Sequence, residues 1–217
     1  MEKAIRIDIR PTGIESAIVC APFDRGLAEL QRDGYEIISL LQNAELRIQQ
    51  GKDHYDSKNG NWVKEGVLYI PGKRNKLVRV SPILESAKEA TQTHRIGKEF
   101  YPTREQIEQS LTDSVDFPEK TIEIPTNRFD WGALTVYAFG GEKKAKAYGE
   151  FLDDAGIKKM PVYPVDKDYV NKQSQPFARQ LWFRLLGDWS GLDGRDGLLD
   201  ARVRGVKVGA EGVMLEK

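Results

Sequence analysis

The chain has 217 residues, which is enough for one large domain or two small ones, and it can bury a sizeable core without disulfides. Its 33 lysine and arginine residues balance 33 aspartate and glutamate residues, so the net charge excludes a long-range attraction to nucleic acid or anionic membranes. Its single cysteine excludes an internal disulfide. No segment approaches the ~20 apolar residues of a membrane span. We therefore expect a soluble, cytoplasmic protein.

The first sixty residues alternate strand and helix patterns. Isoleucines alternate with charged residues across 3–10, which is typical of a half-buried strand. Gly34 and Gly51 are placed to end helices, because glycine readily adopts the left-handed backbone found there. In chain order, we expect a hairpin of strands 3–10 and 14–20, a helix at 24–33, a strand from 35, a helix at 43–50 and a loop at 51–61.

The middle of the chain contains the clearest hairpin pattern. Two apolar runs flank the turn Pro71–Asn75. Ser81 and Pro82 resemble the start of a helix, and Thr103 with Gln106 forms a capping-box pattern that starts another. In chain order, we expect hairpin strands at 62–70 and 76–80, a helix from 81 to about 97, a helix at 103–113, a loop at 113–119 and a strand at 120–124.

The last third of the chain suggests a parallel strand pair. A strand at 134–139, the turn Gly140–Gly141, a helix at 142–155 and a strand at 160–165 together predict a βαβ unit. A helix at 175–186, a loop at 187–197 and one or two strands at 198–208 follow. The expected fold is a single α+β domain over residues 1–217, with a mixed β-sheet, two hairpins and one βαβ unit.

The expected helix at 175–186 combines aromatic residues with arginines. At about 100° per residue, Phe177, Leu181 and Trp182 fall on one face of such a helix. Arg179 and Phe183 fall on the opposite side. A large apolar side chain there either meets another element or belongs to a contact surface. Arg179 and Phe183 are therefore candidate ligand-binding residues.

The second expected hairpin has a basic tip. Lys73, Arg74, Lys76 and Arg79 lie in a stretch between Gly66 and Leu84 that contains no acidic residue. Such a tip can bind phosphates with an affinity that falls as salt rises. The simpler interpretation is an exposed turn whose basic residues protect strand edges.

A second candidate anion site is the turn Gly140–Gly141 at the start of the helix at 142–155. Free amide groups and the positive end of the helix dipole favour an anion there. Lys143 and Lys144 stand at that positive end, which would suit a bound phosphate. The glycine spacing of a dinucleotide site and the ending of a P-loop are both missing. The alternative is a solvated helix that its lysines keep soluble.

Carboxylates provide two weaker leads. Asp8 lies on the first expected strand, which a turn and a second strand follow. This order is loosely similar to the start of ribonuclease-H-like nucleases, in which carboxylates from separate elements hold metal ions. The loop with Asp193 and Asp196 contains glycines but lacks calcium-loop spacing, so tight turns are the better interpretation.

The leading hypothesis is a non-catalytic binding protein that contacts nucleic acid or a phosphate-bearing ligand through local basic patches. Neither a cofactor nor a metal ion is expected for it. One alternative is a metal-dependent phosphodiesterase or nuclease that uses Asp8 with other carboxylates. The other is a protein-interaction subunit.

Overall fold

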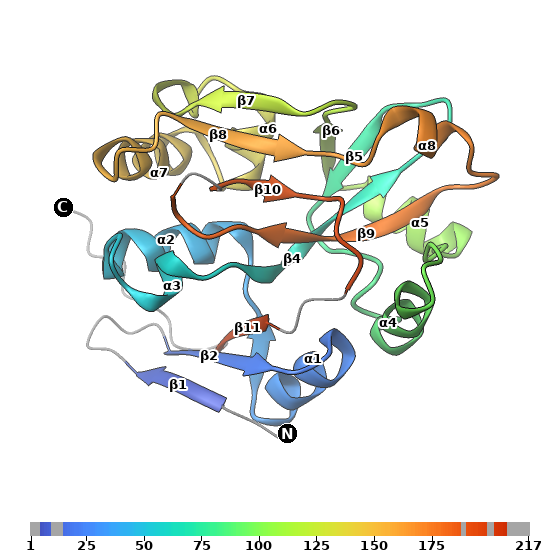
Figure 1. Cartoon of the computed structure of the whole chain (residues 1–217), viewed down its shortest axis with the longest axis horizontal. Coiled ribbons are helices and arrows are strands. Elements are labelled where there is room, and N and C mark those ends of the chain that lie inside the picture. Colours follow the sequence, from blue (N-terminus) through green and yellow to red (C-terminus); the bar gives the residue numbers. More distant parts are fainter. Residues whose placement is uncertain (1–4, 10–14, 188–189, 199–201, 208–217) are drawn as a thin grey trace.

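The computed structural model describes residues 5–9, 15–187, 190–198 and 202–207, with residues 5–9 described by their backbone alone. These residues form a mixed sheet with helices packed around it (Figure 1). The predicted α+β class with a mixed sheet is confirmed. Within the described part of the chain, the helices are all too short or too polar to cross a membrane.

The main path of the sheet runs β1-β2-β11-β4-β9-β10-β8-β7, and β3, β5 and β6 branch from it. The strands are β1 (Ile5–Ile9), β2 (Glu15–Cys20), β3 (Tyr35–Ile37), β4 (Asn61–Tyr69), β5 (Asn75–Val78), β6 (Ser114–Phe117), β7 (Ile122–Pro125), β8 (Lys159–Tyr163), β9 (Phe177–Phe183), β10 (Leu192–Asp193) and β11 (Arg202–Lys207). Most neighbours are antiparallel, whereas β8 and β10, and also β4 and β11, run parallel.

Eight α-helices and one 3-10 helix occur in the described residues. They are α1 (Phe23–Arg32), α2 (Leu40–Gln50), α3 (Tyr55–Lys58), α4 (Ala87–Arg95), α5 (Arg104–Leu111), η1 (Thr126–Arg128), α6 (Ala133–Ala138), α7 (Glu142–Asp154) and α8 (Lys167–Asn171). The capping box predicted from Thr103 and Gln106 is present at the start of α5. Gly34 follows α1 with a φ of 79°, as its predicted role requires.

The strands of both predicted hairpins are paired, and residues 10–14, which join the first pair, lie outside the described part of the chain. β1 pairs antiparallel with β2, and β4 pairs antiparallel with β5. The predicted βαβ unit is absent, because residues 134–138 lie in helix α6, which Phe139 caps, rather than in a strand. The segment is rich in β-prone residues, but Ala138 and Phe139 pack into the core beside α7. Tertiary packing has overridden local propensity here.

The largest correction concerns residues 175–186, where the sequence predicts a helix and the structure has strand β9. Successive residues of β9 point to opposite faces of the sheet, and both faces are buried. Phe177, Leu181 and Phe183 join one core, whereas Ala178 and Trp182 join the other. A strand that is buried on both sides shows no clean alternation of apolar and polar residues. Its pattern can therefore be mistaken for a helix.

The central strands β4 and β9 separate these two cores. The larger core lies between the sheet and α2, α6 and α7. The smaller core packs α1 and α4 against the opposite face. In the smaller core, Trp62 and Trp182 make an edge-to-face contact with ring centroids 4.8 Å apart.

Several boundaries also differ from the prediction. Residues 113–119 contain strand β6, and the loop at 51–61 contains helix α3. Ser81 begins a series of turns rather than a helix, since its Oγ accepts from the amide of Ile83, and α4 starts only at Ala87. The strand from Tyr35 is short because Ser39 caps α2.

Candidate functional site

The predicted basic tip lies on the turn between β4 and β5, and β6 supplies a carboxylate to it. Arg74 Nη1 and Lys76 Nζ lie 2.5 Å and 2.7 Å from the two carboxylate oxygens of Asp116. The pairing of β5 with β6 places Lys76 directly opposite Asp116. Lys76 and then Arg74 lower the pKa of Asp116. Asp116 thus fixes two cations with a single negative charge.

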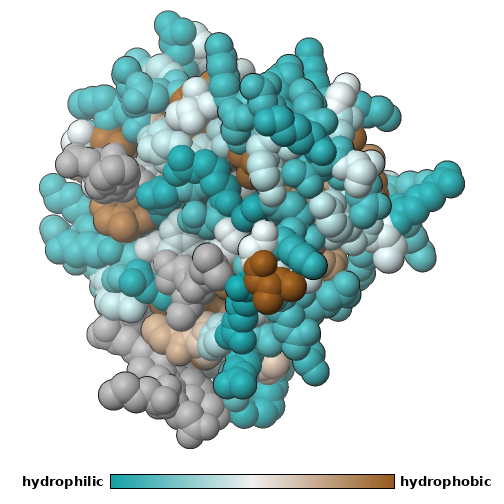
Figure 2. Space-filling model, turned by 45° about the vertical axis from the view of Figure 1, so that its right-hand side comes forward, coloured by the Kyte–Doolittle hydropathy of each residue, from teal (hydrophilic) through white to brown (hydrophobic). Residues whose placement is uncertain are grey.

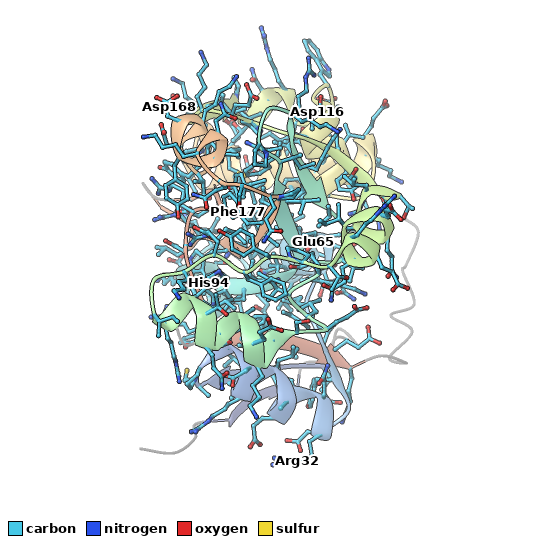
Figure 3. All side chains as sticks on the ribbon, turned by 90° about the vertical axis from the view of Figure 1, so that its right-hand side faces the viewer. Arg32, Glu65, His94, Asp116, Asp168 and Phe177 are labelled. Atoms are coloured by element: carbon cyan, nitrogen blue, oxygen red, sulfur yellow. The ribbon has the colours of Figure 1, made fainter. Side chains whose placement is uncertain are left out.

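Next to this tip is a surface cleft of about 790 Å³, which we call the tip cleft. Its lining includes Phe117, Pro118, Ile122 and Leu134, which are apolar. Its charged lining residues come from the tip, from the turn between β6 and β7, and from the start of α8: Arg74, Asp116, Glu119, Lys120, Asp166 and Lys167. Figure 3 shows Asp116 at the same end of the molecule as Asp168 of α8, away from Glu65 and His94.

The charged residues around the tip cleft are partly paired. Lys167 Nζ lies 2.7 Å from Glu119, and Asp166 caps α8 by accepting from the amides of Asp168 and Tyr169. With Lys73 and Lys76 of the tip, the cations are Lys73, Arg74, Lys76, Lys120 and Lys167, against the carboxylates Asp116, Glu119 and Asp166. The residues that line the cleft balance, with three cations and three carboxylates. The excess of two positive charges comes from Lys73 and Lys76, which lie beside the cleft on the turn and on β5.

Arg79 does not belong to the tip. Its Nη2 donates to the carbonyl of Tyr137 at 2.9 Å, and its guanidinium lies over the Tyr137 ring, 3.9 Å from the centroid. Its Nη1 lies 3.9 Å from Glu65 Oε1, which is beyond hydrogen-bond distance. Arg79 lines a smaller cleft of about 190 Å³ that also contains Glu85 and Asp113. The surroundings of Arg79 are therefore acidic.

Glu65 is fully buried at an irregularity in the pairing of β4 with β9. Its Oε2 accepts from the amide of Leu40 at 2.9 Å, whereas Oε1 has no hydrogen-bond partner among the described residues. Burial raises the pKa of Glu65 to about 7. A bulge that re-aims a charged side chain is often found near functional sites, but this side chain is closed off from solvent.

Arg179 points away from solvent and pairs with Glu99. Its Nε and Nη2 lie 2.7 Å and 2.5 Å from the two carboxylate oxygens of Glu99, and the hydroxyl of Tyr169 donates to the same group at 2.7 Å. Tyr169, Glu99 and Tyr101 line a third cleft of about 450 Å³. Arg179 therefore supports this cleft from behind instead of lining it.

Phe183 is fully buried, so it does not form the exposed contact surface that the helical prediction allowed. Its ring lies 4.0 Å below the guanidinium carbon of Arg47 and packs near Phe139 and Tyr148. The other predicted possibility, that Phe183 meets another element, is what the structure shows. The error follows directly from the helical assignment, since a strand places Phe183 on the same face as Phe177.

The turn before α7 is present as predicted, with φ values of 75° at Gly140 and 117° at Gly141. It follows helix α6 rather than a strand. Lys144 Nζ pairs with Glu45 of α2 at 3.0 Å. Lys143 is exposed. Helix α7 packs against α2, α6 and η1, and none of its residues lines the tip cleft.

The carboxylate leads gain no support from the described residues. In that part of the chain, no three histidine, cysteine or acidic side chains come close enough to hold a metal ion. The side chain of Asp8 lies outside the described residues. Asp193 is fully buried and binds Arg184 and Arg195, so it is neither a solvent-exposed turn residue nor an open cation ligand.

Comparison with known proteins gives one structural likeness. The fold is similar to a solved structure from a study of the accommodation of massive sequence variation in Nanoarchaeota by the C-type lectin fold. The TM-score is 0.69 at 16% sequence identity, and the likeness covers 93% of this chain and 100% of the other. At this identity the likeness shows the fold alone. No family model and no curated protein matches the sequence.

Sequence reasoning missed the acidic partners that organise these sites. Asp116 falls in a segment that the sequence predicts as a loop, Glu99 has no predicted role, and Glu65 is only one of several carboxylates that could accompany Asp8. The sequence offers one signal for Glu65, which is the only acidic residue in the mostly apolar run of 61–69. An ionisable residue within a buried strand is unusual and points to a special environment. Asp116 and Glu99 had no comparable signal, since their partners are distant in sequence.

Proposed function

We propose that this chain is a non-catalytic binding protein whose ligand contacts the tip cleft through an anionic group. The observation that carries the proposal is the coincidence of two features. The basic hairpin tip that the sequence singles out borders the cleft of about 790 Å³. The likeness to a C-type lectin fold that accommodates massive sequence variation also supports it, since such a framework can present different binding surfaces.

A small anionic ligand is better supported than nucleic acid. Strong phosphate-backbone binding needs many basic side chains on one surface. The predicted basic residues are instead spread over separate places: Arg79 contacts Tyr137, Arg179 pairs with Glu99, and Lys144 pairs with Glu45. In Figure 2, the visible face is mostly hydrophilic, with small scattered apolar areas. Among the described candidate residues, the tip is the local basic group that borders a sizeable cleft.

The rival functions have less support. A metal-dependent phosphodiesterase would need Asp8 and partner carboxylates, and the described residues offer no such cluster. A protein-interaction subunit stays a prediction without a specific observation in its favour. A cytoplasmic location also stays a prediction, which fractionation of the native cells would test.

The proposal is tested by titrating pyrophosphate, a short single-stranded RNA and a duplex DNA at low and high salt. We compare the double variant Lys73→Glu with Arg74→Glu against Lys88→Glu, which changes an exposed lysine on α4. We expect pyrophosphate affinity to fall at least tenfold in the tip variant and to stay unchanged in the control. Unchanged binding by the tip variant would contradict the proposal. If Lys143→Glu instead lowers the pyrophosphate affinity, the binding site lies at the start of α7 and not at the tip.

A further inference from the structure

We propose that the ligand of the tip cleft is a free small amphiphile, with an apolar body on the cleft floor and a carboxylate, phosphate or sulfonate group at the basic tip. This inference rests on the proposed function and names its ligand class. It is carried by the volume of the cleft, by its apolar floor and by the excess positive charge around it.

The volume and the floor suit the body of such a ligand. Small-molecule sites typically have volumes of about 300–1,000 Å³ and a mainly apolar lining with few polar groups, and the tip cleft lies in that range at about 790 Å³. Phe117 belongs to the larger core, and Ile122 and Leu134 pack against that core. The floor is therefore the outer surface of a packed core rather than an isolated patch.

The tip suits the anionic group. Asp116 holds Arg74 and Lys76 in place, but its single charge balances only one of them. Arginine has five N–H donors, so Arg74 keeps donors for a ligand while it binds Asp116. Lys73, on the turn, and Lys120, in the cleft lining, have no ion-pair partner among the described residues. A bound anion would compensate the remaining positive charge.

Other ligand classes match only half of these features. A polar anion such as inorganic phosphate would leave the apolar floor exposed. An alkylammonium ion could cover the floor but would meet the excess of positive charge. The apolar contact adds about 0.8 kcal/mol for each buried CH₂ group, so an anion with an alkyl chain should bind much more tightly than the same head group alone.

The test uses the fluorescence of 8-anilinonaphthalene-1-sulfonate, an apolar body with a sulfonate, on the full chain. Three competitors are compared below their micelle-forming concentrations: octyl phosphate, octylammonium and inorganic phosphate. We expect octyl phosphate to displace the probe at a concentration at least tenfold lower than octylammonium, and inorganic phosphate to leave it bound. The double variant Arg74→Gln with Lys120→Gln should lower the affinity for octyl phosphate at least tenfold, whereas Lys88→Gln should leave that affinity unchanged.

A floor variant separates the two parts of the ligand. Leu134→Asn should lower the affinity for octyl phosphate at least tenfold and leave the affinity for pyrophosphate unchanged. The control Val80→Asn, which changes an exposed apolar residue at another cleft, should change neither affinity. Retained cooperative unfolding shows that each variant is folded. If Leu134→Asn does not fold, the exposed double variant still decides the outcome.

The results distinguish this inference from the proposed function. If pyrophosphate depends on the tip but octyl phosphate binds no more tightly, the amphiphile is wrong and the proposed function stands. If substitutions at the tip change the binding of none of these ligands, the amphiphile inference and the proposed function are both wrong. If anionic vesicles bind while monomeric octyl phosphate does not compete, the site recognises a membrane surface, and the free-amphiphile proposal is overturned.

Discussion

Glu65 is fully buried, one of its carboxylate oxygens has no hydrogen-bond partner in the described part of the chain, and its pKa is raised to about 7. The ordinary pKa of a glutamate, 4.5, applies to the unfolded chain, so the folded protein holds the proton more tightly. Between about pH 4.5 and pH 7 the folded state therefore binds more protons than the unfolded state, and stability falls as the pH rises through this window. The position is thus destabilising at neutral pH, and its Arg79 neighbour relieves this only at long range.

The first prediction concerns Glu65→Gln. Glutamine keeps an acceptor for the Leu40 amide but cannot ionise, so we expect the variant to be more stable than the wild type at pH 8. At 1.36 kcal/mol per pKa unit, the upper bound of the gain is roughly 3 kcal/mol. The gain should shrink towards pH 4.5. Urea unfolding at several pH values measures it, and an equal pH slope in both proteins would contradict the assignment.

The second prediction concerns His94, whose effect on stability should change with pH in the opposite direction to that of Glu65. Burial, with help from Arg179, lowers its pKa to about 4, and its Nδ1 accepts from the amide of Leu198 at 3.3 Å. The unfolded chain takes up a proton near pH 6.5 that the folded chain resists, so His94 costs stability as the pH falls from 6.5 to 4. We expect His94→Asn, which retains an acceptor, to lose less stability than the wild type over this window. A steeper loss in the variant, measured by the same urea series, would refute the prediction.

At the scale of elements, the sequence predicted what is local and missed what depends on tertiary contacts. Capping residues and glycine stops are encoded within a few residues, so α1, α5 and α7 were found close to their observed bounds. Strand β9 and helix α6 were misassigned because packing decides their conformation. The candidate site shows the same division: the basic tip was visible in the sequence, whereas Asp116 and the apolar floor come from β6, β7 and α6.

Helix α7 allows a test of how closely elements pack. A Cβ added at Gly149 would lie 2.3 Å from the carbonyl oxygen of Thr126 and 3.2 Å from Phe129 Cβ. Glycine to alanine in a helix normally stabilises by about 0.5–1 kcal/mol. Here η1 would have to move away from α7, so we expect Gly149→Ala to destabilise by about 1–3 kcal/mol. Thermal unfolding measures this, with the exposed Lys146→Ala on the same helix as the control. A stabilised Gly149→Ala would show that η1 is not tightly packed.

For the whole molecule, the two cores share the strands that separate them. β4 contributes Val67 to the larger core and Trp62 to the smaller one. β9 likewise divides Phe183 and Trp182 between them. A substitution that destabilises one core should therefore also destabilise the other, so that both unfold in one transition. We expect this even though the chain is longer than most two-state proteins.

Phe183→Ala tests this coupling. Removing a buried phenylalanine ring typically costs 3–5 kcal/mol, and the cavity would form in the larger core between Arg47 and Phe139. We expect tryptophan fluorescence, which reports on Trp62 and Trp182 in the smaller core, to shift to lower urea together with the far-ultraviolet circular dichroism. The double variant Trp131→Phe with Trp189→Phe serves as the background for both proteins, because it leaves only Trp62 and Trp182 as fluorescent tryptophans. Trp131 is 75% exposed and reports on neither core, and Trp189 lies outside the described residues. Because a shared β4–β9 pair cannot lose one face and keep the other, the two transitions should move together. A circular-dichroism shift with an unmoved tryptophan transition would contradict this coupling and show that the two cores unfold independently.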